Sequence, residues 1–293
     1  MPLQAFLSPI SATRGRELPS EHTQINGDKG FGDALSRGAA DIAAGAGAWR
    51  NWCYLSWHEV KRQYKRSVLG PMWLTLNMGV LVGALGWFYS SIFNQDIQFF
   101  LPYLALGFII FGLISGMVNE SCTIFSNSSA GIKQSAIPLS FYCFKAVTRQ
   151  AILFAHNILI YFVILIFFDV PVGLSALLIF PALILIFIGG FFVMTIIGPI
   201  SARFRDIPPI VTSIMQIFFF FTPIFWLPTD ELRRSELLFL NPFYHYLEMT
   251  RRPLLGLESD PVNWIVALGI TVVLGIVSLT FFSKYRSQIV YWV

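Results

Sequence analysis

Long runs of apolar residues alternate with short polar connections from residue 72 to the end of the chain. Six runs are long enough to cross the roughly 30 Å hydrocarbon core of a membrane as helices, and none contains Asp, Glu, Lys or Arg. These runs are 72–93, 99–119, 150–168, 172–200, 207–227 and 263–282. Because a helix satisfies its own backbone polar groups inside lipid, the pattern predicts an all-α membrane protein with six transmembrane helices.

Residues 49–66 show a different pattern, with apolar and basic side chains on opposite faces of a helix. One arc of this helix carries Trp49, Trp52, Cys53, Trp57, Val60 and Tyr64, and the other carries Arg50, His58, Lys61, Arg62, Lys65 and Arg66. The pattern predicts an N-terminal amphipathic helix in the membrane interface, with its basic face toward the cytoplasm. Such a helix either only anchors the fold or also docks a partner or a lipid headgroup, and both interpretations stay open.

Residues 1–46 are rich in Gly, Ser and Ala and show no hydrophobic periodicity. Pro2 and Pro9 interrupt the one apolar stretch near the start, so no signal peptide is predicted. We therefore predict a flexible cytoplasmic extension over 1–46 and a transmembrane domain over 47–293.

The segment 228–262 is the one long connection on the side opposite the termini. Thr229 suits the start of a short helix over 229–240, and a second short helix follows over 243–252. Neither helix is long enough to span a membrane, so the pair predicts a short external hairpin that is re-entrant or lies on the surface. In a functional interpretation, this hairpin is a lid that covers the exit of a pore. The lid residues would be Asn241, Pro242, Glu248 and Arg252.

The composition agrees with a membrane protein and argues against a soluble enzyme, a disordered chain or a disulfide-rich secreted domain. Apolar residues make up 55% of the chain and charged residues 12%, whereas a soluble domain carries about 25% charged residues. Of the 20 Lys and Arg residues, 16 lie on the side that holds both termini, so the positive-inside rule predicts cytoplasmic termini. The cysteines Cys53, Cys122 and Cys143 have no metal-ligand spacing, and we expect no metal site.

Few ionisable residues lie at the ends of the spans, and four of them fall close together on the predicted cytoplasmic side. Glu120 ends the second span, and Lys145, Arg149 and His156 share one face of the third. Because ionisable groups in a membrane are costly unless paired, the simplest interpretation pairs Glu120 with Arg149. The alternative is a polar patch at a substrate entrance that accepts an anionic group.

One face of the fifth predicted span combines aromatic and polar side chains. This face carries Thr212, Gln216, Phe219, Phe220 and Pro223. Aromatic rings stack on the apolar faces of sugars, so the combination suits a glycan path. It equally suits helix packing and an interfacial aromatic belt.

The motifs of nucleotide hydrolysis and of hydrolytic enzymes are absent. The sequence has no G-x-x-x-x-G-K-[ST] phosphate loop, no zinc-protease signature and no G-x-S-x-G elbow. It also lacks the midplane charges that an ion-coupled carrier would usually show. We therefore predict that the chain is not an enzyme and that, as a transporter, it takes its energy from another polypeptide.

Four separated motifs resemble those of the permease subunits of polysaccharide ABC exporters. Residues 64–73 resemble their R-Y-x-x-S-x-L-G-x-x-W entry, 202–207 their A-R-x-R-D-I loop, and 221–224 their T-P-I element. Residues 241–248, followed by 252–256, look most like the O-antigen branch. The likeness covers the chain from about residue 50 onward.

The resemblance implies a homodimer of six-span subunits in the bacterial inner membrane, with two separate ATP-binding cassette subunits. Those subunits would hold ATP and Mg²⁺, and no cofactor is expected in this chain. The implied substrate is an undecaprenyl-diphosphate-linked O-antigen, moved from the cytoplasmic to the outer leaflet. A capsule or teichoic-acid exporter, a small-molecule or drug exporter, and a scaffold without transport stay open as alternatives.

Three groups of site residues are expected on this basis, besides contacts with membrane lipids; no nucleic-acid partner is expected. The ATPase would dock on the loop 133–139 and on residues 50–66, and its contact in the loop would use Lys133, Ile137 and Pro138. The substrate headgroup, with its negative diphosphate, would bind Lys61, Arg62, Lys65, Arg66 and Arg149. The glycan path would use Thr212, Gln216, Phe219 and Phe220.

Overall fold

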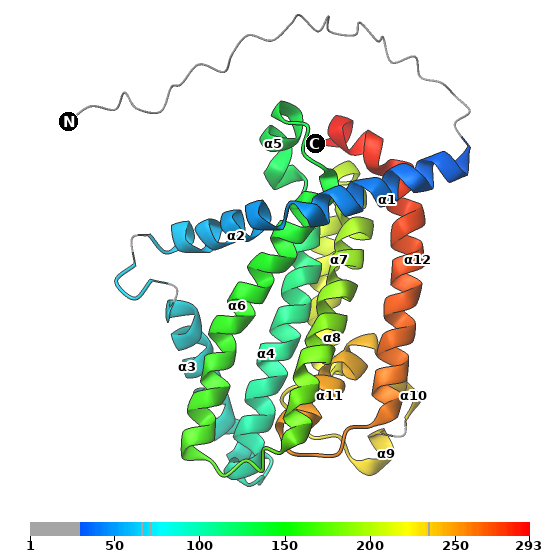
Figure 1. Cartoon of the computed structure of the whole chain (residues 1–293). Coiled ribbons are helices and arrows are strands. Elements are labelled where there is room, and N and C mark those ends of the chain that lie inside the picture. Colours follow the sequence, from blue (N-terminus) through cyan, green and yellow to red (C-terminus); the bar gives the residue numbers. More distant parts are fainter. Residues whose placement is uncertain (1–29, 66, 71, 234) are drawn as a thin grey trace, which may run out of the picture.

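The computed structural model describes residues 30–65, 67–70, 72–233 and 235–293. Within these ranges the chain forms helices and no strands, which confirms the predicted all-α class. Figure 1 shows a bundle of long helices with α1 (Phe31–Gly47) and α2 (Trp49–Gln63) lying across one end. The short helix α5 (Ser129–Gln134) and the C-terminus lie at that same end (Figure 1).

Five helices in the described part of the chain are long and apolar enough to cross a membrane. They are α3 (Met72–Ile92), α4 (Ile97–Ser121), α6 (Leu139–Phe167), α7 (Ile179–Arg203) with the preceding turn η2 (Leu174–Leu178), and α12 (Pro261–Trp292). α6 begins well before its predicted window and α12 runs well beyond its own, so both helices extend past the hydrocarbon core. The chain is therefore a multi-pass membrane protein.

The fifth predicted span is shorter in the structure than the window 207–227. α8 (Ile207–Phe221) has 15 residues, and at about 1.5 Å per residue it covers roughly 23 Å, less than the hydrocarbon core. Thr222 is extended at ψ 134°, and Pro223 follows it, so the helix ends there. Sequence hydropathy overestimates this span because the non-helical residues 222–227 are as apolar as the helix itself.

The segment 222–227 packs directly on α4. A Cβ added to Gly107 would lie 2.9 Å from the carbonyl oxygen of Ile224, so only glycine allows this approach. The Tyr103 hydroxyl shares its one hydrogen between the carbonyl oxygens of Pro223 and Trp226, at 3.0 and 3.2 Å. These bonds satisfy backbone groups that lie outside a helix, as a membrane environment requires.

α11 (Pro242–Leu254) lies inside the bundle, against α4, α7 and α12. Its Arg251 side chain is 1% exposed, pairs with Glu248 and lies 3.7 Å from the centre of the Tyr103 ring. Arg251 also donates to the carbonyl oxygen of Pro223, at 2.7 Å. The second helix of the predicted hairpin therefore lies in the interior rather than on the surface, and Arg251 connects it to Pro223 and to the Tyr103 ring.

The first helix of the hairpin differs from the prediction. In place of one helix over 229–240, the chain forms α9 (Asp230–Arg233) and α10 (Glu236–Phe239). Ser235 between them is extended, at φ −71° and ψ 145°, which interrupts the helical hydrogen bonds. Figure 1 shows α9, α10 and α11 at the end of the bundle opposite α1 and α2.

The prediction of a flexible extension over 1–46 is wrong for residues 31–46, because they belong to α1. Residues 1–29 lie outside the described part of the chain. The face of α1 that meets α6 and α12 carries mostly small residues, and Ile42 is its large apolar side chain packed against the core. A Cβ on Gly38 would lie 1.9 Å from Ser283 Oγ, and one on Gly45 would lie 2.2 Å from Ser140 Oγ. The prediction missed α1 because this helix contacts the bundle mainly through the close approach of small residues and only to a lesser extent through large apolar side chains.

We predict that Gly107→Ala lowers the thermal unfolding midpoint of the detergent-solubilised protein, because its Cβ would push the 222–227 segment away from α4. Overpacking of this kind costs about 1–3 kcal/mol. Gly112→Ala in the same helix is the matched control, since its Cβ would meet only the end of Met78, at 4.0 Å. Equal midpoints for the two variants would contradict the packing described here.

Candidate functional site

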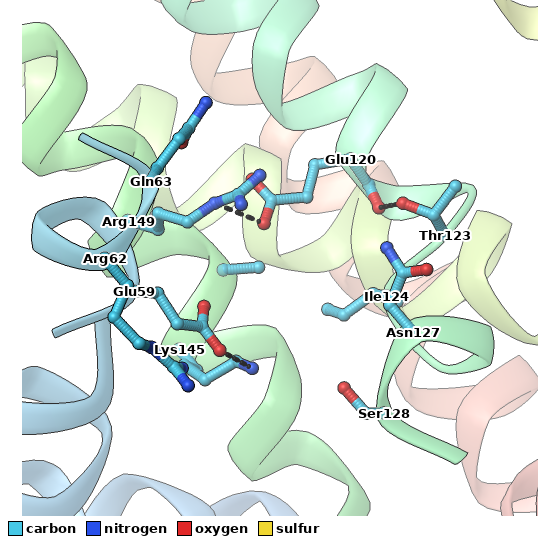
Figure 2. Close-up of a pocket in the computed structure, with 11 residues that line it drawn as sticks. Glu59, Arg62, Gln63, Glu120, Thr123, Ile124, Asn127, Ser128, Lys145 and Arg149 are labelled. Carbon is cyan, nitrogen blue, oxygen red and sulfur yellow. Dashed lines mark hydrogen bonds and ion pairs between the residues drawn. The ribbon is translucent and has the colours of Figure 1, made fainter. Parts of the chain in front are cut away.

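A pocket of about 420 Å³ lies between α2, the end of α4 and the start of α6 (Figure 2). It opens at the end of the bundle that carries α1, α2 and α5. Most of its lining is polar or charged. The lining residues are Glu59, Arg62, Gln63, Glu120, Thr123, Ile124, Asn127, Ser128, Lys145, Ala146 and Arg149.

Two ion pairs cross this pocket and connect α6 to its neighbours (Figure 2). Lys145 Nζ lies 2.6 Å from Glu59 Oε1, which joins α6 to α2. Arg149 Nε lies 2.9 Å from Glu120 Oε1, which joins α6 to α4. Gln150 Nε2 donates to the second Glu120 oxygen at 2.6 Å, so both oxygens of this carboxylate have partners.

The sequence-based pairing of Glu120 with Arg149 is confirmed. The pair between Glu59 and Lys145 was not predicted, because the two residues are 86 positions apart and lie in different helices. One signal could have found it. Glu59 is the one acidic residue of the amphipathic helix, and it needs a partner at membrane depth.

α2 presents one face to α6 and leaves the other uncovered. Ser56 is fully buried and its hydroxyl donates to the Lys145 carbonyl oxygen at 2.7 Å, and Trp52 stacks on Phe144 with ring centres 5.8 Å apart. Trp49 and Trp57 remain about half exposed. The predicted apolar arc therefore divides between packing on α6 and a surface that the protein does not cover.

The pocket has an excess of cations over carboxylates. Arg62, Lys145 and Arg149 face Glu59 and Glu120. Within the described residues Arg62 forms no ion pair, and its side chain is exposed. The Arg149 side chain remains 34% exposed despite its pair, so an anion entering the pocket could reach it.

The five predicted headgroup residues do not lie together. Arg62 and Arg149 line the pocket, whereas Lys61 and Lys65 are exposed and do not line it. Arg66 lies outside the described residues. The structure adds Lys145, which belongs to the predicted polar patch with Arg149 but is not one of the five headgroup residues.

The residues predicted for a glycan path divide between packing and exposure. Phe219 packs between Phe108 and Phe111 of α4, with ring centres 5.5 and 5.7 Å away. Thr212, Gln216 and Phe220 are exposed on α8.

The exposed face of α8 is linked to α4 by a side-chain hydrogen bond. Thr212 Oγ1 donates to Asn119 Oδ1 at 3.2 Å. Because Asn119 precedes Glu120, this contact brings the polar face of α8 next to the part of α4 that lines the pocket.

The predicted ATPase contact lies on the surface near the pocket. Lys133 is exposed at the end of α5, and Ile137 is 40% exposed in the connection that follows. Pro138 is half-buried and stands directly before α6.

The predicted lid residues are held within the fold at the opposite end. Asn241 is buried, caps α11 and donates to Thr222 Oγ1 at 2.9 Å, and Glu248 pairs with Arg251. Pro242 begins α11, and Arg252 Nε donates to the Glu258 carbonyl oxygen at 2.6 Å. A lid at this end stays a prediction. In the described ranges, no group of three His, Cys, Asp or Glu side chains comes together as metal ligands.

A multi-pass helical bundle with an amphipathic helix across one end and a charged pocket beneath it is typical of a membrane transport permease. The chain belongs to the ABC-2 type transporter family, whose model matches residues 50–255. It is similar to the O-antigen export system permease protein RfbA of Myxococcus xanthus, with 26% identity over 222 residues, which cover 70% of this chain and 84% of that protein. These findings confirm the resemblance to polysaccharide exporter permeases, and the family implies ATP-binding cassette partner subunits.

We predict that Glu120→Gln lowers the thermal unfolding midpoint, because it leaves Arg149 without its counter-charge in a partly buried site. Adding Arg149→Gln should recover part of the loss, with a coupling energy of about 1–3 kcal/mol in a double-mutant cycle. Glu236→Gln, which changes an exposed acid at the other end of the bundle, is the control. Strictly additive single effects would show that the ion pair does not stabilise the fold.

Proposed function

We propose that the chain is the transmembrane subunit of an ATP-driven exporter of undecaprenyl-diphosphate-linked O-antigen polysaccharide. It moves this substrate from the cytoplasmic to the outer leaflet of the bacterial inner membrane. The pocket between α2, α4 and α6 carries the proposal, because it gathers three cations at one end of a membrane bundle. The likeness to an O-antigen export permease supports the choice of substrate.

The pocket end of the bundle faces the cytoplasm in this proposal. It carries α1, α2, α5 and the C-terminus (Figure 1), and the segments at this end hold most of the Lys and Arg residues. Basic residues concentrate on the cytoplasmic side of membrane proteins. A lipid-linked glycan made in the cytoplasm would then meet α2 and the pocket first.

The diphosphate of the substrate binds Arg62 and Arg149. A diphosphate carries about two negative charges, and planar guanidinium groups make strong, often paired hydrogen bonds to phosphate. Arg62 is unpaired within the described residues and Arg149 is partly accessible, so both can gain an anionic partner. Lys61 and Lys65 attract anionic lipid from the exposed face of α2, at about 1 kcal/mol each.

The glycan follows the open face of α8. Thr212 and Gln216 offer hydroxyl and amide groups, and Phe220 offers an exposed ring for stacking on sugars. A second copy of the chain covers this face from the other side, so that the path forms between two subunits. Both α3 and α8 present several exposed apolar side chains, which lipid and a partner subunit would cover.

The energy comes from two ATP-binding cassette subunits, which bind ATP and Mg²⁺ and contact the exposed segment around Lys133 and Ile137. This chain itself needs no cofactor. An exporter of capsular polysaccharide or teichoic acid would use the same headgroup site where its glycan is carried on a lipid diphosphate. A small-molecule exporter would not need it.

We predict that Arg62→Gln with Arg149→Gln raises the lipid-linked glycan concentration for half-maximal stimulation of ATP hydrolysis by about tenfold or more. A loss of 1.4 kcal/mol over two charge-assisted contacts corresponds to tenfold. The measurement uses the complex with its ATPase in nanodiscs of neutral lipid. The control, Lys61→Gln with Lys65→Gln, should change this concentration less than about twofold in neutral lipid. Equal shifts for the two pairs would indicate general electrostatic anchoring and contradict the pocket assignment.

A second prediction concerns the ATPase contact. Ile137→Asp should weaken co-purification of the ATPase subunit, because a charge replaces an exposed apolar side chain at the proposed interface. Leu257→Asp is matched in exposure, 37% against 40%, and lies at the other end of the bundle. Similar yields of ATPase with both variants would exclude this segment as the contact.

A further inference from the structure

One carboxylate connects three helices at the start of α6. Asp41 of α1 accepts hydrogen bonds from the backbone N–H groups of Leu139 and Ser140, at 3.3 and 3.0 Å. Its Oδ2 atom also lies 3.0 Å from Arg286 Nη1 of α12. Both α1 and α12 lie outside residues 50–255, so this connection is made by parts of the chain that the family model does not cover.

The two backbone bonds form an N-cap that is supplied from another helix. A helix leaves its first backbone N–H groups without partners, and a carboxylate there satisfies them and interacts well with the helix dipole. The residue that precedes α6 is Pro138, which has no side chain able to cap it. Asp41, 98 positions earlier than Leu139, takes this role.

Further contacts fix α1 in place. The Ser140 hydroxyl donates to the Asp41 carbonyl oxygen at 2.7 Å, and Arg286 donates to the Arg37 carbonyl oxygen at 2.8 Å. Gly38 and Gly45 sit so close to α12 and α6 that neither has room for a side chain. α1 therefore cannot slide along the bundle without breaking the cap.

The capped turn lies between two functional parts of the molecule. The segment 133–138, where the ATPase is proposed to bind, runs directly into Leu139. Lys145 and Arg149, whose side chains line the pocket, lie within the next turns of the same helix. If the first turn of α6 frayed, a movement of the ATPase would unwind this turn and leave the pocket residues in place. A capped turn stays helical, so the same movement displaces the pocket residues.

We propose that Asp41 is a positioning residue for energy coupling: it holds the first turn of α6 so that movement of the 133–138 segment reaches the pocket. This proposal rests on the proposed function, because it requires an ATPase subunit that acts on this segment. The cap itself does not depend on the ATPase and is tested separately.

The cap is tested by hydrogen exchange on the full-length permease in nanodiscs without its partner. Asp41→Ala should speed exchange of amides over 139–142 by about fivefold or more, the effect of losing an N-cap. Asp33→Ala removes an exposed acid in the first turn of α1, the helix that carries Asp41, and should leave this exchange unchanged. Unchanged exchange in the Asp41→Ala protein would overturn the proposal.

Coupling is tested with the ATPase bound, as glycan transported per ATP hydrolysed. Asp41→Ala should lower this ratio about threefold or more while the ATPase still co-purifies. Asp41→Asn keeps one acceptor oxygen, which can serve only one of the two amides, so it should lose less of the ratio than Asp41→Ala does. An unchanged ratio in Asp41→Ala, or an equal loss in Asp41→Asn, would overturn the positioning role.

A second variant keeps the test valid if Asp41→Ala fails to fold. Arg286→Asp places a like charge beside Asp41 without changing it, and should also speed exchange and lower the ratio. A wild-type ratio in this variant would contradict the proposal. If the wild-type permease binds no ATPase at all, the proposed function fails, and that result is distinct from a failure of Asp41 alone.

Discussion

Three carboxylates from three other helices hold the first turns of α6. Asp41 of α1 caps its first backbone groups, Glu59 of α2 pairs with Lys145, and Glu120 of α4 pairs with Arg149. Partly buried charges at the edge of a membrane are costly unless paired, so each contact restricts where α6 can lie. The amphipathic helix, the pocket and the segment around Pro138 all take their positions from this set of contacts.

The two ends of the bundle use paired charges differently. At the end with α9–α11, Arg251 is enclosed with Glu248 and Tyr103, and its contacts tie α11 and the 222–227 segment to α4. At the pocket end, Arg149 keeps a third of its side chain exposed and Arg62 is open to solvent. The first arrangement fixes a structure, and the second leaves cations available to an anionic ligand.

Apolar runs were sufficient to predict the five long spans and the all-α class, because hydrocarbon thickness fixes a minimum length. The pair of Glu120 and Arg149 was predictable because both charges lie at the same membrane depth. Three features of the fold and the site could not be predicted from the sequence. α8 is short because Pro223 ends it within an apolar run, α1 is attached mainly through small residues, and Glu59 meets Lys145 only through the tertiary packing of α2 on α6.

Photo-cross-linking from the pocket lining tests most directly whether this site receives a lipid diphosphate. A photoreactive residue in place of Asn127, in the wild-type charge background, faces the pocket, whereas one in place of Lys61 lies outside it. With undecaprenyl-diphosphate-linked glycan in nanodiscs, we expect cross-links at 127 that decrease when excess unlabelled substrate is added, and few at 61. Cross-links at 61 with none at 127 would show that the headgroup binds on the exposed face of α2, and would contradict the account.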